Sequence, residues 1–155
     1  MANALSRWLR RASGRLYLFN KGAYTLHSGG SSMFKIDCDA LTDADLAAVA
    51  QELYVRLPAF SRVVGVPTGG LRLALALDRY VVPDAGRLLV VDDVLTTGAS
   101  ITAHRRVACL ENTELIARTI GAAIFARGDW PAWVTPLFVI AMSRPAADVE
   151  RKGNA

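Results

Sequence analysis

Apolar positions in the first half of the chain show a helical period after residue 42. Leu46, Val49, Leu53 and Leu57 recur every three or four positions, which is the spacing of one face of an α-helix. Thr42 comes just before this pattern and is expected to be the N-cap, because its hydroxyl oxygen accepts from a backbone N–H of the first turn. The pattern predicts an amphipathic helix over residues 43–57.

The spacing of the apolar residues changes after residue 60. Residues 62–66 are a short run of β-branched and small residues that predicts a strand, and the sequence Pro-Thr-Gly-Gly at 67–70 predicts a turn. The leucine- and alanine-rich segment 71–81 then predicts a buried helix. Strand, turn and helix in this order form one βα unit.

A second unit of the same kind follows. Residues 88–91 are all apolar, which is typical of a strand buried on both faces of a parallel sheet, and Asp92 and Asp93 are expected to end it. Small hydroxyl residues and glycine at 96–100 predict the turn, and residues 101–111 continue as a helix. The repeated unit favours a parallel sheet with crossover helices.

Two more apolar runs, residues 116–125 and 136–141, predict two further strands. The predicted fold class is α/β: a single doubly wound domain whose mostly parallel central sheet of about four strands, with a fifth left open, is flanked by helices. Residues 1–155 are expected to form one domain, with an N-terminal helix and a small hood in residues 1–40 and the α/β core in residues 41–145. In such sheets ligands bind beyond the carboxyl ends of the strands.

Composition narrows the class of protein. The 155 residues are 52% hydrophobic and 21% charged, which excludes a disordered, collagen-like or coiled-coil chain. No apolar run approaches the roughly 20 residues of a membrane-spanning helix, and arginines interrupt the first 19 residues where a secretory signal needs an apolar stretch. We therefore expect a cytoplasmic protein without a membrane partner. Cys38 and Cys109 lie far apart and suggest neither a disulfide framework nor a zinc site, so both are expected to be buried.

The net charge of +4 favours anionic partners. Arg7, Arg10, Arg11 and Arg15 crowd around Trp8 near the start of the chain. A short amphipathic helix with its arginines in water is the favoured interpretation, while a nucleic-acid-binding arm stays open as the alternative.

The most specific feature is the segment LLVVDDVLTTGAS at residues 88–100. Two adjacent carboxylates at the tip of a buried strand repel each other unless they meet donors or cations. The small hydroxyl residues and glycine behind them open a helix, whose first backbone N–H groups and positive dipole end favour a phosphate. A ligand with hydroxyls near a terminal phosphate, such as a ribose 5-phosphate, fits both halves. Asp92 and Asp93 as simple turn caps are disfavoured, because a cap needs one carboxylate.

These thirteen residues resemble the 5-phosphoribosyl 1-pyrophosphate (PRPP) motif of type I phosphoribosyltransferases. Three further segments follow the pattern of the orotate phosphoribosyltransferases, in the order of that family. Gly22–Asp37 is similar to their hood segment, Val64–Leu71 resembles their pyrophosphate loop, and Arg127 follows an apolar strand where the family keeps an arginine for the base.

The resemblance implies transfer of the phosphoribosyl group from PRPP to a nucleobase, with orotate favoured, and release of pyrophosphate. Asp92 and Asp93 would be the catalytic residues, holding the ribose hydroxyls and stabilising positive charge on the ring. Mg²⁺ is the implied cofactor, bound mainly through PRPP, so no residue is predicted as a metal ligand. A homodimer is the implied assembly.

The resemblance also implies two sets of binding residues. Those for PRPP are Thr96, Thr97, Gly98, Ala99, Ser100, Thr68, Gly69, Gly70 and His27. Those for the base are the backbone near Lys35 and Ile36 and the guanidinium of Arg127.

The sequence departs from the orotate enzymes in one large respect. Their long basic loop before the PRPP strand, which closes over the site, is replaced by the short segment 80–86. In addition, Gly69 stands where that family has a lysine. Because closing loops exclude water and bring cations to the leaving group, a PRPP-binding regulatory or nucleic-acid-associated protein without efficient transferase activity is the alternative function.

Overall fold

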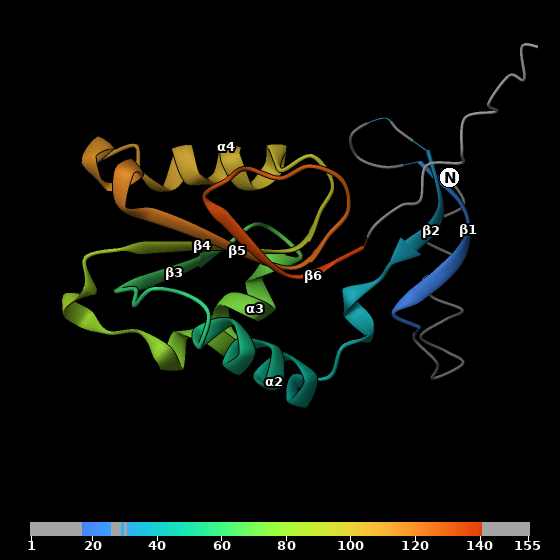
Figure 1. Cartoon of the computed structure of the whole chain (residues 1–155), viewed down its shortest axis with the longest axis horizontal. Coiled ribbons are helices and arrows are strands. Elements are labelled where there is room, and N and C mark those ends of the chain that lie inside the picture. The colour runs from blue at the N-terminus through green and yellow to red at the C-terminus, as the bar shows by residue number, and fades with distance from the viewer. Residues whose placement is uncertain (1–16, 26–28, 30, 141–155) are drawn as a thin grey trace, which may run out of the picture.

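The computed structural model describes residues 17–25, 29 and 31–140. A four-stranded parallel sheet in the order β3-β4-β5-β6 forms the centre of the molecule (Figure 1). Its strands are β3 (Arg62–Gly65), β4 (Leu88–Leu95), β5 (Thr119–Ala126) and β6 (Val134–Val139).

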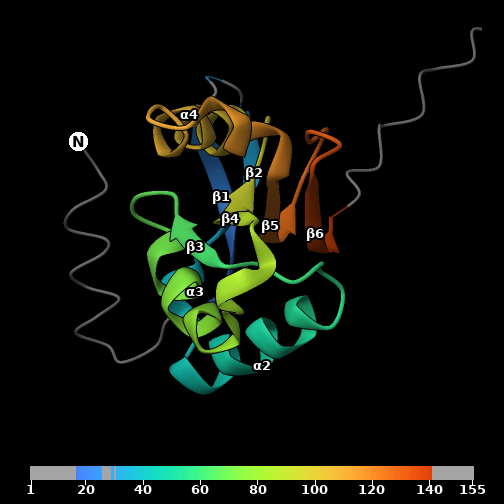
Figure 2. The same ribbon diagram turned by 90° about the vertical axis from the view of Figure 1, so that its left-hand side faces the viewer.

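Helices cover both faces of this sheet. The helices α2 (Asp43–Tyr54) and α3 (Gly70–Leu77) lie on one face, and α4 (Ala99–Ala108) lies on the other (Figures 1 and 2). The predicted α/β class with a parallel sheet between helices is thus confirmed, with four strands in the central sheet among the described residues. Three of the connections contain short 3₁₀ helices, which are Cys38–Ala40, Asp78–Tyr80, Pro83–Ala85 and Thr113–Arg118.

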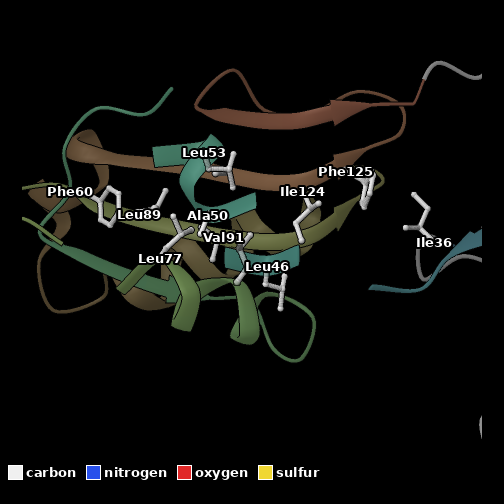
Figure 3. Close-up of a cluster of buried hydrophobic side chains, with 12 residues drawn as sticks. Ile36, Leu46, Ala50, Leu53, Phe60, Leu77, Leu89, Val91, Ile124 and Phe125 are labelled. Atoms are coloured by element: carbon white, nitrogen blue, oxygen red, sulfur yellow. The ribbon is translucent and has the colours of Figure 1, made fainter. Parts of the chain in front are cut away.

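Two hydrophobic clusters hold the layers together, because successive residues of β4 point to opposite faces of the sheet. Leu89 and Val91 pack with α2 and α3, in the cluster shown in Figure 3. Leu88 and Val90 pack in the other cluster, with Ile101 of α4. All five side chains are fully buried. Since burial of such a side chain contributes about 1.5–3 kcal/mol, β4 stabilises both layers.

Helix α2 begins as the sequence predicts. The Thr42 hydroxyl accepts from the Asp45 N–H at 3.2 Å, and the Asp45 carboxylate accepts from the Thr42 N–H at 2.8 Å, so the two residues form a capping box. Leu46 and Leu53 are buried as predicted. The helix ends at Tyr54, so Leu57 lies beyond it and packs against the core from the following loop.

Several predicted boundaries were wrong, including those of β6, which is Val134–Val139 and not 136–141, and of α4, which is Ala99–Ala108 and not 101–111. Strand β4 does not end at Asp92 but continues to Leu95, because β5 offers it a partner as far as Ala126. Strand β5 begins at Thr119 and not at residue 116, since the preceding residues form a 3₁₀ helix whose Leu115 carbonyl accepts from the Thr119 hydroxyl at 2.7 Å. The helix predicted over 71–81 is α-helical only from Gly70 to Leu77.

The hood is a separate antiparallel hairpin of β1 (Phe19–Thr25) and β2 (Ser31–Ile36) at one end of the central sheet (Figure 1). Side chains fasten it to the core. Ile36 is buried in the cluster of Figure 3, and the Phe19 ring meets the Phe125 ring edge to face with centroids 5.9 Å apart. The hood therefore depends on packing at the carboxyl ends of the strands for its position.

The connection between α3 and β4 is short and structured. It consists of two 3₁₀ turns, Asp78–Tyr80 and Pro83–Ala85, with the Tyr80 ring stacked on Tyr54 of α2 at 4.5 Å. Within the described residues no helix is both long enough and apolar enough to cross a membrane. The predicted N-terminal helix and its arginine cluster lie outside the described residues.

Candidate functional site

The two carboxylates lie where β4 extends past its neighbour β3. Pairing of β3 with β4 ends at Gly65 and Val91, and the next residue of β4 is Asp92, which is 6% exposed. The Asp92 carboxylate accepts from the Asp93 N–H at 2.9 Å, and the Asp93 carboxylate accepts from the Val94 N–H at 2.7 Å. Both side chains are thus fixed by the strand's own backbone at the open edge of the sheet.

Burial, together with the negative charge of Asp93 beside it, raises the pKa of the Asp92 carboxyl to about 7. The shift has this direction because a charged carboxylate loses water in the buried site and is repelled by its neighbour. A ligand that brings hydroxyl donors or positive charge to this position would favour the ionised form. The pair is therefore suited to a partner with hydroxyls and a developing positive charge.

The turn after β4 forms a pocket that opens to solvent, with an empty volume of about 190 Å³. Its lining residues are Asp92, Val94, Leu95, Thr96, Thr97, Gly98, Ala99, Ser100 and Ile101. Helix α4 begins here, so the N–H groups of its first turn have no intrahelical partners, and that of Ala99 donates to the Thr97 hydroxyl at 3.4 Å. The predicted phosphate residues thus line one pocket together with Asp92.

Gly98 gives this turn its shape. Its backbone has φ of +71°, a left-handed conformation that residues with a side chain rarely adopt. A Cβ at this position would also overlap the ring of Pro131, which comes from the loop between β5 and β6. The turn at residues 96–100, predicted to bind a phosphate and called the phosphate turn below, is therefore shaped by Pro131, more than 30 positions further along the chain. No pattern in the sequence indicates this contact of Pro131.

The loop after β3 reaches the same carboxylates. A Cβ at Gly69 would overlap the Asp93 carboxylate, and one at Gly70 would overlap the Val91 carbonyl oxygen. The Gly70 N–H donates to the Val66 carbonyl at 2.9 Å, so its role is close packing and its amide is used within the loop. Thr68 and Gly69 are exposed, and the peptide bond between Pro67 and Thr68 is cis. The structure therefore brings the predicted pyrophosphate loop against Asp93.

On the base side, Arg127 follows β5 and is 8% exposed. Its backbone N–H donates to the Leu95 carbonyl at 2.9 Å. Its guanidinium donates to the Phe34 carbonyl at 3.4 Å and to the Ser32 hydroxyl, and it lies 4.3 Å from the centroid of the Phe34 ring. Burial lowers the pKa of Arg127, which stays a cation because guanidinium is a very strong base. Arg127 is thus close to the hood strand that carries Lys35 and Ile36.

The other predicted base residues differ in what they offer. Ile36 is buried in the core, and the exposed Lys35 forms an ion pair with Asp37 at 3.6 Å. Binding of a base by the backbone of Lys35 and Ile36 stays a prediction. His27 lies outside the described residues.

The contacts that Ser32 and Phe34 make near this site were not identified from the sequence. Ser32 and Phe34 contact Arg127 across more than 90 positions of chain.

Cys38, predicted to be buried, is only partly buried, and burial together with the charge of Asp93 raises the pKa of its thiol to about 12. The thiol is therefore neutral and close to the carboxylate pair. Cys109 is buried as predicted.

No family model matches the chain, and no curated protein matches it. Its structure is similar to that of the orotate phosphoribosyltransferase from Aeropyrum pernix, with a TM-score of 0.64 and 25% identity over 87% of this chain and 93% of that one. The orotate phosphoribosyltransferase of Mycobacterium tuberculosis gives a TM-score of 0.51 and 19% identity over 88% of this chain and 94% of that one. With UMP synthase from Leishmania donovani the TM-score is 0.56 and the identity 23%, over 79% of this chain and 34% of that one.

Orotate phosphoribosyltransferases are thus among the solved structures that this chain is similar to. The resemblance noted in the sequence is confirmed by the fold, a parallel α/β sheet of the type I phosphoribosyltransferase kind.

Proposed function

We propose that the protein is a phosphoribosyltransferase that moves the 5-phosphoribosyl group of PRPP to a nucleobase, with orotate the favoured base, and releases pyrophosphate. The observation that carries the proposal is the convergence of three segments on one edge of the sheet. The carboxylate pair of β4, the pocket at the start of α4 and the glycine loop after β3 meet at Asp92 and Asp93. This arrangement suits the hydroxyls, the 5-phosphate and the pyrophosphate of a single PRPP molecule.

In the proposed reaction the bond between the anomeric carbon and the pyrophosphate oxygen breaks, and pyrophosphate leaves with the electron pair. A ring nitrogen of the base forms the new bond to this carbon and gives up its proton. Positive charge develops on the ribose ring in between, and the carboxylates of Asp92 and Asp93 stabilise it electrostatically. Because both carboxylates are fixed by backbone N–H groups, little reorganisation is needed as the charge develops.

The residues present fit a magnesium ion that arrives with PRPP. Two adjacent carboxylates, those of Asp92 and Asp93, lie at the site. Mg²⁺ commonly keeps several waters and binds through one or two carboxylates and substrate phosphates. When bound, it would neutralise charge on the leaving pyrophosphate.

Orotate is favoured as the base because of Arg127. A planar guanidinium matches a carboxylate better than any other side chain does, since it can donate two parallel hydrogen bonds. Burial of Arg127 strengthens the attraction between its guanidinium and a carboxylate, because a charge is less screened where water is partly excluded. The named activity of the similar proteins, orotate phosphoribosyltransferase, supports the same base. A homodimer and a cytoplasmic location stay predictions.

One observation favours the alternative, a PRPP-binding protein without efficient turnover. The connection from Leu77 to Leu88 consists of short 3₁₀ turns, and the Tyr80 ring is stacked on Tyr54. A connection packed in this way cannot close over the site as a long basic loop does. In that case PRPP would bind and dissociate unchanged.

One experiment separates the two functions. Pyrophosphate release from PRPP with Mg²⁺ is measured with orotate, uracil, hypoxanthine and adenine in turn and without a base, beside calorimetric titration of PRPP. Release that depends on orotate supports the proposed transferase, and release with another base corrects the substrate. PRPP binding without release under any of these conditions favours the alternative. Neither binding nor release would overturn both.

A further inference from the structure

The guanidinium of Arg127 is held by a closed set of hydrogen bonds in the hood strand β2. The Ser32 hydroxyl donates to the Phe34 carbonyl at 2.7 Å and accepts from the Phe34 N–H at 3.2 Å. Arg127 donates to both of these oxygens, one from each terminal nitrogen. Ser32 is 5% exposed, so its hydroxyl has little water to exchange with and its orientation is set by these partners.

This arrangement occupies only one edge of the guanidinium. The group has five N–H donors, arranged so that two edges can each bind a pair of oxygens. The edge formed by the two terminal nitrogens is directed to Ser32 and Phe34. On the edge formed by Nε and one terminal nitrogen, no hydrogen bond is seen to any described residue. The Phe34 ring covers one face of the plane, with its centroid 4.3 Å from the guanidinium carbon.

We propose that Ser32 is a positioning residue for base recognition: it fixes the plane of the Arg127 guanidinium so that the second edge meets a carboxylate on the base. Ser32 does not itself touch the base. Its effect is on the selectivity between a base with a carboxylate and the same base without one. A guanidinium free to rotate pays conformational entropy when it binds a carboxylate, and a guanidinium already held does not.

This inference rests on the proposed function, because it assumes that Arg127 faces the base. It goes further in naming the residue that gives Arg127 its orientation. It also explains why β2 is fastened to the core at this point, although β2 pairs only with β1 in the described sheets. The Arg127 contacts thus add to the packing of Ile36 and Phe19 that fastens the hood to the core.

The test compares two nucleotides that differ only in the carboxylate, orotidine 5′-monophosphate and uridine 5′-monophosphate. Their affinities are measured by calorimetry for the wild-type protein, for Ser32→Ala and for Ser31→Ala. Ser31 is the matched control, since it is the adjacent serine of β2 but is exposed and lies on the other side of the strand. Binding of uridine monophosphate serves as the internal measure of folded protein. A loss of folded protein affects the binding of both nucleotides equally, so the ratio of the two affinities does not depend on how much of a variant is folded.

We expect the wild-type protein to prefer the carboxylated nucleotide. Ser32→Ala should reduce this preference about fivefold, the typical effect of one hydrogen bond, with little change for uridine monophosphate. Ser31→Ala should leave the preference unchanged. An equal loss for both nucleotides in Ser32→Ala would mean a purely structural role and would overturn the proposal, as would an unchanged ratio or a wild-type protein without preference.

Pyrophosphate release and the ratio of nucleotide affinities together distinguish failure of the proposed transferase function from failure of the proposed role of Ser32. A wild-type protein that prefers orotidine monophosphate but releases no pyrophosphate with any base contradicts the transferase and leaves the role of Ser32 to be decided by the ratio. Conversely, pyrophosphate release with a base that carries no carboxylate, together with no preference between the nucleotides, supports a transferase and contradicts the role of Ser32.

Discussion

Gly69 lies so close to Asp93 that no side chain fits between them. The position where a Cβ would be is filled by the Asp93 carboxylate, although Gly69 itself has an ordinary φ of −65°. The glycine is therefore required for space and not for backbone conformation. This links the loop after β3 to the carboxylate pair of β4.

Gly69→Ala should displace the Asp93 carboxylate and weaken PRPP binding by tenfold or more, since both segments are proposed to contact the same ligand. Calorimetric titration with PRPP and Mg²⁺ measures the effect. Gly86→Ala is the control: its left-handed φ of +66° makes alanine costly, but its Cβ would meet only the Arg118 side chain at 3.6 Å. That variant should lose stability and keep its PRPP affinity. Unchanged affinity in Gly69→Ala would contradict the shared site.

Asp92→Asn should lower the rate of pyrophosphate release by roughly 100-fold, because an amide cannot stabilise positive charge on the ribose ring as a carboxylate does. The substitution keeps the size of the side chain. Single-turnover measurement at saturating PRPP isolates this step. A rate close to that of the wild-type protein would remove Asp92 from the proposed catalytic pair.

The pH dependence of stability follows from the raised pKa of Asp92. The folded protein holds this proton up to a pH of about 7, whereas the unfolded chain releases it near the ordinary value of 3.8. The stability contributed by the protonated carboxyl is complete below pH 4 and is lost as the pH rises towards 7. Asp92→Asn cannot ionise, so it should melt several degrees above the wild-type protein at pH 8, and this gap should shrink as the pH falls to 4. Thermal unfolding followed by circular dichroism at several pH values gives the comparison, and a gap independent of pH would contradict the assignment.

Activity should depend on pH in the opposite sense. The proposed role of Asp92 needs the ionised carboxylate, so pyrophosphate release at low PRPP should rise as the pH increases through about 7. The profile of kcat/KM between pH 5.5 and 8.5 tests this. In Asp92→Asn the rise should disappear. If the rise persists in that variant, another group is responsible for it.

Gly98→Ala should destabilise the phosphate turn for two reasons, its left-handed φ of +71° and the overlap of a Cβ with the Pro131 ring. We expect a lower melting temperature and a loss of affinity for inorganic phosphate and PRPP. Pro131→Ala removes the ring, so the double variant should recover part of what Gly98→Ala loses. Strictly additive effects in this double-mutant cycle would mean that the two residues do not interact.

The order of elements and the phosphate turn could be predicted from the sequence because each depends on residues close together in the chain. The capping box of Thr42, the apolar run of β4 and the turn at 96–100 are local patterns. The place where the predicted site residues meet could also be predicted, because ligands of parallel α/β sheets bind at the carboxyl ends of the strands. Asp92, Thr96 and Gly98 line one pocket, and the ligand predicted for them stays a prediction.

The extent of β4 and the contacts of Arg127 and Gly98 could not be predicted, because they depend on segments that are distant in the sequence. The extension of β4 to Leu95 depends on how far its neighbour β5 runs, which no pattern within β4 reveals. Likewise, Ser32 contacts Arg127 across 95 positions, and Pro131 reaches Gly98 from another loop. A single sequence predicts such pairs only through a family resemblance, and the resemblance pointed to Arg127 without its partners.

The hood and the central sheet form two separate hydrogen-bonded sheets. The proposed phosphoribosyl half of the site belongs to the central sheet, while the hood strand β2 meets the proposed base half at Arg127. If Arg127 binds the base as proposed, substitutions in β2 are expected to alter the choice of base while the strands of the central sheet stay unchanged. Substrate choice could then change during evolution through one strand that lies outside the central sheet.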